Sequence, residues 1–103
     1  MPGWLSRVLG RIHALAAQGR VRFTLKALQE LAVLDLDADD AVEVLHGLTA
    51  KDSAGRLVSA HTGEWMYVFK PAVGETTVYL KLVLRTDCVV VSFHEEESGD
   101  DED

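Results

Sequence analysis

The chain lacks several features that mark whole classes of protein. Its single cysteine, Cys88, excludes an intrachain disulfide and so disfavours a small secreted scaffold. The longest unbroken apolar run covers five residues, 65–69, whereas a membrane-spanning helix needs about 20. Arg7 and Arg11 interrupt the N-terminal apolar stretch, and no obvious cleavage site follows it, which argues against a secretory signal. These absences predict a cytoplasmic protein without a membrane partner.

What is present is the composition of one small globular domain. The chain has 103 residues, within the range of about 50 to 200 that single domains commonly occupy. Hydrophobic residues make up 48% of it and charged residues 26%, as in ordinary globular proteins with a packed core. Two domains, or a largely disordered chain, are therefore excluded.

Positive charge is scarce overall but not in the body of the chain. Ten Lys and Arg stand against 17 Asp and Glu, and a net charge of -7 would ordinarily repel a nucleic acid. Seven of the acids lie within the last nine residues, however, and positions 1–94 hold ten acids and ten bases. We therefore expect one domain over residues 1–94 and a disordered acidic tail over residues 95–103. Such a tail either aids solubility or competes with a phosphate backbone for the protein's own basic groups.

The first half of the chain has the apolar periodicity of helices. Residues 4–18 carry apolar side chains at helical spacing, and Gly19 follows as a left-handed cap. After a short extended piece at 20–23, Thr24 can cap the start of a second helix and Asp37 the start of a third. We therefore expect three helices before residue 48.

The second half alternates apolar and polar side chains with a period of two, which indicates strands. We expect them near 56–60, 65–70, 77–85 and 88–94, joined by short turns as antiparallel hairpins. Helices followed by strands predict an α+β domain in which N-terminal helices pack on one face of a C-terminal antiparallel sheet.

The last hairpin is expected to turn at Thr86 and Asp87. This register places Tyr79 opposite His94 and Lys81 opposite Ser92, whereas a three-residue loop would reverse the faces of one strand. The side chains expected to point inward are Trp65, Tyr67, Phe69, Val78, Leu80, Leu82, Leu84, Val89, Val91 and Phe93. Those expected to point outward are Met66, Val68, Lys70, Thr77, Tyr79, Lys81, Val83, Arg85, Cys88, Val90, Ser92 and His94.

The outward set brings a phenol, an imidazole and two ammonium groups together without a nearby carboxylate. Tyr79, His94, Lys70 and Lys81 would then form a face suited to an anion. Antiparallel sheets also leave one polar face in water without any ligand, so a plain solvated surface is the competing interpretation.

Several short segments resemble the MqsR family of bacterial toxin–antitoxin ribonucleases. They are Gly-Arg-Val-Arg-Phe-Thr at 19–24, Gly-Leu-Thr at 47–49, Val-Tyr-Leu-Lys at 78–81 and Val-Val-Val-Ser-Phe at 89–93. The resemblance covers most of residues 5–94. It implies a RelE-like α+β fold and cleavage of single-stranded mRNA without a metal or other cofactor. It also implies inhibition by a cognate antitoxin encoded beside the toxin.

The resemblance also suggests roles for individual residues. Tyr79 and Lys81 match the family's tyrosine and the lysine that follows it, while His94 stands where the family has a lysine and Met66 where it has a glutamine. Arg56 is the nearest equivalent of a lysine in the loop after the third helix. We therefore expect Tyr79, His94 and Arg56 to be catalytic, with an imidazole able to move protons near neutral pH.

Lys70 and Lys81 are expected to bind RNA by neutralising its phosphates. The alternative is a family member that has lost catalysis and acts as an antitoxin-binding or regulatory interaction module. The acidic tail and the replacement of glutamine by Met66, which cannot donate a hydrogen bond, favour that alternative. The presence of His94 and Tyr79 on one face opposes it. The four histidines and Cys88 show no metal-ligand spacing, so no metal site is expected.

Overall fold

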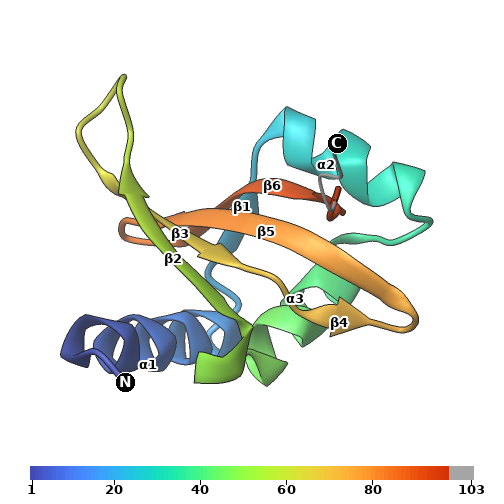
Figure 1. The fold of residues 1–103 in the computed structure, drawn as a ribbon. Helices are drawn as coiled ribbons and strands as arrows, with labels where there is room; N and C mark the ends of the chain where they lie inside the picture. Colours follow the sequence, from blue (N-terminus) through green and yellow to red (C-terminus); the bar gives the residue numbers. More distant parts are fainter. Residues whose placement is uncertain (98–103) are drawn as a thin grey trace.

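The computed structural model describes residues 1–97 and has the expected α+β organisation (Figure 1). Its elements are α1 (Gly3–Ala17), β1 (Val21–Phe23), α2 (Leu25–Val33), α3 (Ala38–Gly47), the short 3-10 helix η1 (Ala50–Asp52), β2 (Ser53–Val58), β3 (Trp65–Phe69), β4 (Ala72–Val73), β5 (Thr76–Leu84) and β6 (Cys88–Glu95). The strand order in the sheet is β1-β6-β5-β3-β2, and β4 pairs with β5. In Figure 1, α1 and α3 lie on one side of the sheet and α2 lies beside β6.

The predicted helix ends are confirmed. Gly19 follows α1 with a φ of 71°, a conformation that glycine adopts without strain. The Thr24 side chain accepts a hydrogen bond from the Ala27 N–H at 3.1 Å and so caps α2. Asp37 and Asp40 form a reciprocal capping box at the start of α3, each bond 2.9 Å long.

The sheet is mixed, because the segment expected as a short extended piece is a strand. This segment, β1, pairs in parallel with the first half of β6, with Val21 beside Cys88. Beyond β1, the start of α2 continues along the same edge of β6, where the N–H of its cap residue Thr24 donates a hydrogen bond to the Val90 carbonyl at 3.1 Å. The helix packs its buried Ala27 and Leu31 into the core, so β6 is covered along both halves of its edge.

A single hydrophobic core joins the three helices to the sheet. Ile12 of α1, Leu31 of α2, Leu45 of α3 and Phe93 of β6 are all almost fully buried within it. Burial of such side chains is the main stabilising term of the fold, at roughly 1.5 to 3 kcal/mol for each. The core fixes the orientation of β5 and β6, and therefore of the side chains on their opposite face.

The last hairpin differs from the expected register near its turn. Leu84 pairs with Cys88, so the loop has three residues rather than two. Cys88 and Val90 consequently point into the core and not outward as predicted, while the partly exposed Val89 and Val91 are not core residues. A β-bulge at Val91 then restores the expected register further along, with Lys81 opposite Ser92.

Strand β6 extends into the segment expected to be a tail. Glu95 pairs with Val78, and the Glu96 N–H donates to the Thr77 carbonyl at 2.8 Å. The remainder of the acidic segment, 98–103, lies outside the described residues. Within residues 1–97, no helix is both long enough and apolar enough to cross a membrane.

Candidate active site

Tyr79 and His94 lie directly opposite each other on β5 and β6, as predicted. Their rings are stacked, with centroids 5.1 Å apart and planes inclined by 13°. Both side chains are half-buried, so their neighbours restrict them while water still reaches them. A phenol and an imidazole are therefore held together on the sheet face that α1 and α3 do not cover.

Lys70 continues this row on the other side of Tyr79. Phe69 pairs with Leu80, and the Pro71 carbonyl accepts a hydrogen bond from the Val78 N–H at 2.9 Å, so the register persists past the end of β3. Lys70 stands between these two points and faces Tyr79. Its ammonium group forms an ion pair with the carboxylate of Glu96.

A second row of side chains lies next to the first. Lys81 is flanked by Val68 of β3 and Ser92 of β6, its partners in the two ladders. Lys26 reaches this row from α2 and donates to the Ser92 hydroxyl at 3.0 Å. Ser92 is the one polar residue among those buried in the described part of the chain, and the lysine satisfies it. Three ammonium groups therefore surround the Tyr79–His94 pair.

The hydrogen bond of His94 defines which ring nitrogen is available. Its Nδ1 lies 2.9 Å from the backbone carbonyl oxygen of Glu95. A carbonyl can accept but not donate, so Nδ1 carries the proton in this contact. In the neutral imidazole, Nε2 then keeps its lone pair and can accept a proton from a substrate.

Glu30 of α2 brings a carboxylate to this edge of the sheet. Its Oε1 accepts the Phe93 N–H at 2.9 Å, and its Oε2 lies 3.0 Å from the Lys26 ammonium. Burial by itself raises the pKa of the Glu30 carboxyl, but the Phe93 hydrogen bond and Lys26 outweigh it and lower the pKa. Glu30 therefore stays ionised and anchors α2 against β6.

The sequence did not predict that Lys26 and Glu30 lie at this site. Their spacing of four residues indicates a helix-surface ion pair, which is common and carries no functional signal by itself. They reach Ser92 and Phe93 because α2 packs along β6, more than 60 residues away in the chain. Such a contact depends on tertiary packing and not on local pattern.

Two hollows lie near these rows of side chains, one lined in part by His94 and the other in part by Lys81. One, of about 550 Å³, lies beside α2 and is lined by Glu30, Val33, Leu34, His94, Glu95, Glu96 and Glu97. The other, of about 540 Å³, is lined in part by the β2–β3 loop and has Met66, Val83 and Val91 among its apolar lining. Its charged lining consists of Lys81 and the Glu64–Arg85 ion pair. Its apolar lining offers a surface for a nucleotide base beside the ammonium of Lys81, whereas the Arg85 guanidinium there is neutralised by Glu64.

Arg56 is not brought to this site. It pairs with Tyr67, whose ladder partner Leu82 is buried in the core. Because directly paired residues share a face, Arg56 points to the α1 side of the sheet. Its guanidinium carbon lies 4.5 Å from the ring centroid of Trp4 and 4.0 Å from that of Trp65. The structure therefore separates Arg56 from Tyr79 and His94.

The Cys88 thiol is not accessible to a substrate or reagent in the folded protein. Its side chain is fully buried, and burial raises the pKa of its thiol to about 12. The reactive thiolate is thus suppressed. Among the described residues, no three His, Cys, Asp or Glu side chains gather in a way that would hold a metal ion.

Comparison with known proteins places the chain in a family. Residues 6–95 match the family model described as "Motility quorum-sensing regulator, toxin of MqsA". The chain is also 35% identical over 89 residues to the mRNA interferase toxin MqsR of Escherichia coli (strain K12), a match that covers 84% of this chain and 90% of that protein. The family match spans both the helices and the sheet that carry the Tyr79–His94 pair. The chain therefore belongs to the MqsR toxin family.

Proposed function

We propose that the chain is the toxin of a toxin–antitoxin pair and an endoribonuclease that cleaves single-stranded mRNA without a metal ion. The observation that carries this proposal is the stacked Tyr79–His94 pair, flanked by lysines on an open face of the sheet. The family description names a toxin, and the relative from E. coli is named an mRNA interferase, which supports the same activity.

The chemistry follows from the side chains present. His94 Nε2 takes the proton of an RNA 2′-hydroxyl, whose oxygen attacks the adjacent phosphorus while the bond from phosphorus to the 5′-oxygen breaks. The leaving oxygen receives a proton from the Tyr79 hydroxyl or from water. Lys26, Lys70 and Lys81 stabilise the negative charge that builds up on the phosphate. The products are a 2′,3′-cyclic phosphate and a 5′-hydroxyl.

Lys70 and Lys81 are the proposed RNA-binding residues, and Lys26 joins them because its ammonium lies beside Ser92. Arg56 is not part of the proposed machinery, since its guanidinium lies on the other face of the sheet. The partner is proposed to be the antitoxin encoded beside the toxin, in keeping with the family description "toxin of MqsA".

A second candidate is a family member that binds its antitoxin but no longer cleaves RNA. Two observations favour it: Glu96 pairs with Lys70, and the apolar Met66 lines the hollow next to Lys81. Both reduce the capacity of the face to hold a phosphate. Neither removes the imidazole or the phenol, so the nuclease remains the preferred function.

The deciding experiment is incubation of the purified full-length protein with labelled single-stranded RNA in EDTA. The proposed enzyme yields fragments that end in a 2′,3′-cyclic phosphate, and RNA methylated on its 2′-oxygens stays intact. RNA that is bound but uncut, together with capture of the product of the neighbouring gene, would establish the interaction module instead. Growth arrest on expression, relieved by that neighbour, tests the toxin assignment separately.

A further inference from the structure

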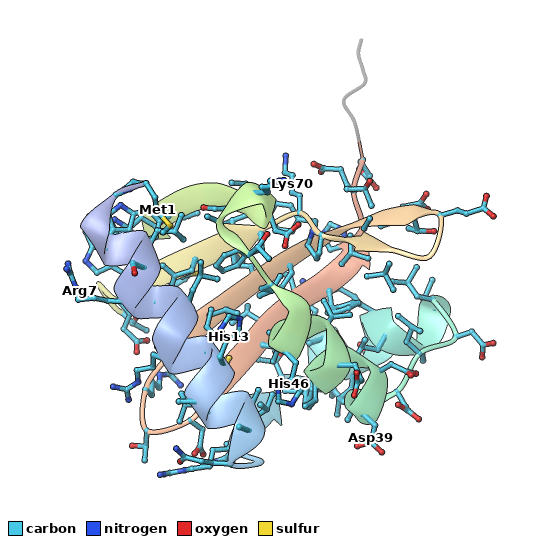
Figure 2. The ribbon with its side chains drawn as sticks, turned by 90° about the horizontal axis from the view of Figure 1, so that it is seen from below. Met1, Arg7, His13, Asp39, His46 and Lys70 are labelled. Carbon is cyan, nitrogen blue, oxygen red and sulfur yellow. The ribbon has the colours of Figure 1, made fainter. Side chains whose placement is uncertain are left out.

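A second group of cations and aromatic rings lies on the opposite side of the sheet from Tyr79 and His94. We call it the arginine–tryptophan cluster: Trp4, Arg7, Arg11, Arg56 and Trp65. A hollow of about 450 Å³ is lined by Trp4, Arg7, Val8, Arg11, Arg56, Tyr67, Leu84 and Arg85 and by no carboxylate. Figure 2 shows Arg7 projecting from α1, well separated from Lys70 on the molecule.

The aromatic rings and Arg56 form a stack. The rings of Trp4 and Tyr67 have centroids 5.8 Å apart and planes inclined by 28°. The Arg56 guanidinium lies over both Trp4 and Trp65, 4.5 and 4.0 Å from their centroids. Trp65 is 44% exposed, so it offers indole surface to the solvent next to the cations.

The charges of this cluster are not balanced within the fold. Arg85 is neutralised by Glu64 through two hydrogen bonds of 2.8 and 2.7 Å. Arg7, Arg11 and Arg56, in contrast, form no ion pair among residues 1–97. Three uncompensated guanidinium groups therefore border one hollow in a chain whose net charge is -7.

A structural role accounts for only part of this arrangement. The contact between Trp4 and Tyr67 fastens α1 to the sheet. Arg7 and Arg11, however, lie four residues apart on the same side of α1, where like charges destabilise a helix. Arg11 Nη2 donates to the Arg85 backbone carbonyl at 2.6 Å and so ties α1 to the β5–β6 turn, but that bond leaves the repulsion between the two charges in place. An anion in the hollow would relieve it.

We propose that the arginine–tryptophan cluster is a second contact site for single-stranded RNA, an inference that rests on RNA being the substrate. Arg7 and Arg11 bind backbone phosphates, and a base stacks on the exposed indole of Trp65. Exposed indole beside unpaired arginine is the combination that single-stranded nucleic acid uses, and an acidic peptide requires no stacking surface. Because this site lies across the sheet from His94, it contributes to affinity and not to the chemical step.

The two tryptophans of the chain provide a direct test, because both belong to the cluster. Titration with single-stranded RNA methylated on its 2′-oxygens, which the proposed chemistry cannot cleave, should change the indole emission. The same change is expected in a variant that combines Tyr79→Phe with His94→Ala. A double variant that no longer cleaves RNA but still shows the emission change would separate the proposed catalysis from RNA binding at the cluster.

Arginine variants measure the phosphate contacts. Arg7→Ala with Arg11→Ala should lower RNA affinity about tenfold at low salt and reduce the slope of log affinity against log salt by about 1.4, or 0.7 for each contact. Arg7→Lys with Arg11→Lys should keep the slope. Lys51→Ala, which removes an exposed cation of η1 outside the hollow, is the matched control and should keep it too. Alanine and lysine are both good helix formers, so α1 should remain folded, as circular dichroism can verify.

Trp65→Ala should weaken binding about tenfold through loss of stacking, and Trp65→Phe should recover part of it. Two results together would overturn the inference. One is that the variant with Arg7→Ala and Arg11→Ala binds RNA with the affinity and salt slope of the parent protein. The other is that the indole emission of the parent protein stays unchanged when RNA binds. In that case cleavage in EDTA would still support the proposed function. An unchanged indole response together with binding of an acidic protein to the cluster would also overturn it.

Discussion

Tyr79 lies opposite His94 because β6 contains one extra residue, Val91, between the turn and the site. The three-residue loop would by itself reverse the faces of β6, and it does so for Cys88 and Val90. The bulge at Val91 returns His94 to the outer face. The site therefore depends on two irregularities that offset each other.

Removal of the imidazole should abolish most of the catalysis. His94→Ala is expected to lower the cleavage rate by about 10² to 10⁴, the usual contribution of a general acid or base. Tyr79→Phe keeps the stacked ring but loses the hydroxyl, with a loss of about 10². Rates are measured on labelled single-stranded RNA in EDTA. His46→Ala, in the exposed last turn of α3, is the matched histidine control and should cleave like the parent. Equal rates for His94→Ala and the control would refute the assignment.

The family lysine offers a complementary test at the same position. His94→Lys should keep measurable cleavage but move the pH optimum upward, because an ammonium group exchanges its proton at a higher pH than an imidazole. The pH–rate profiles of the two proteins are compared on the same RNA. Superimposable profiles would mean that this position takes no part in proton transfer.

The features predicted well from the sequence are those that local chemistry determines. Thr24 and Asp37 cap their helices because a short oxygen side chain satisfies the first free N–H groups wherever it occurs. The alternation along β5 buried Val78, Leu80 and Leu82 as expected. The pairing of Tyr79 with His94 was also predicted, although for a turn of the wrong length.

The features that were missed depend on irregular backbone or on distant packing. Arg56 follows a register irregularity in β2 at which Gly55 has a φ of 97°. That bend determines which face Arg56 occupies, and period-two alternation does not reveal it. Lys26 joins the site only because α2 packs along β6, so no spacing in the sequence could have placed it there.

Glu96 limits access to Lys70, so its removal should strengthen RNA binding. The Glu96 side chain is less exposed than the Lys70 side chain with which it pairs, and its backbone N–H donates to the Thr77 carbonyl. Glu96→Gln keeps the shape but frees the ammonium for a phosphate. Affinity for 2′-O-methylated RNA should rise severalfold at low salt and converge with the parent at high salt, where screening weakens both interactions.

Glu43→Gln removes one charge from an exposed carboxylate on α3 and is the matched control. It should leave the affinity close to that of the parent, because α3 lies on the other side of the sheet. An equal gain in both variants would point to net charge alone and would exclude a specific role for the Lys70–Glu96 pair.

Glu30 should make stability depend on pH. The pKa of its carboxyl is lowered in the folded protein, so the native state favours the ionised form more than the unfolded state does. Its contribution is present at neutral pH and is lost as the pH falls through and below about 4, the ordinary carboxyl range. Glu30→Gln should cost about 1 to 2 kcal/mol at pH 7, as loss of a charged hydrogen bond does. Denaturant unfolding at pH 7 and pH 3 measures this, and a constant difference would contradict it.

Cys88 should resist alkylation until the protein unfolds. Burial raises the pKa of its thiol from 9.0 to about 12, and the reactive species is the thiolate. Because the folded pKa is the higher one, the associated stability is complete below pH 9 and is lost as the pH rises toward 12. Iodoacetamide at pH 8 should therefore label the native protein at the rate of global unfolding, and the guanidinium-unfolded chain at once. Rapid labelling of the native protein, followed by mass spectrometry, would show that the β1–β6 edge opens locally without unfolding the core.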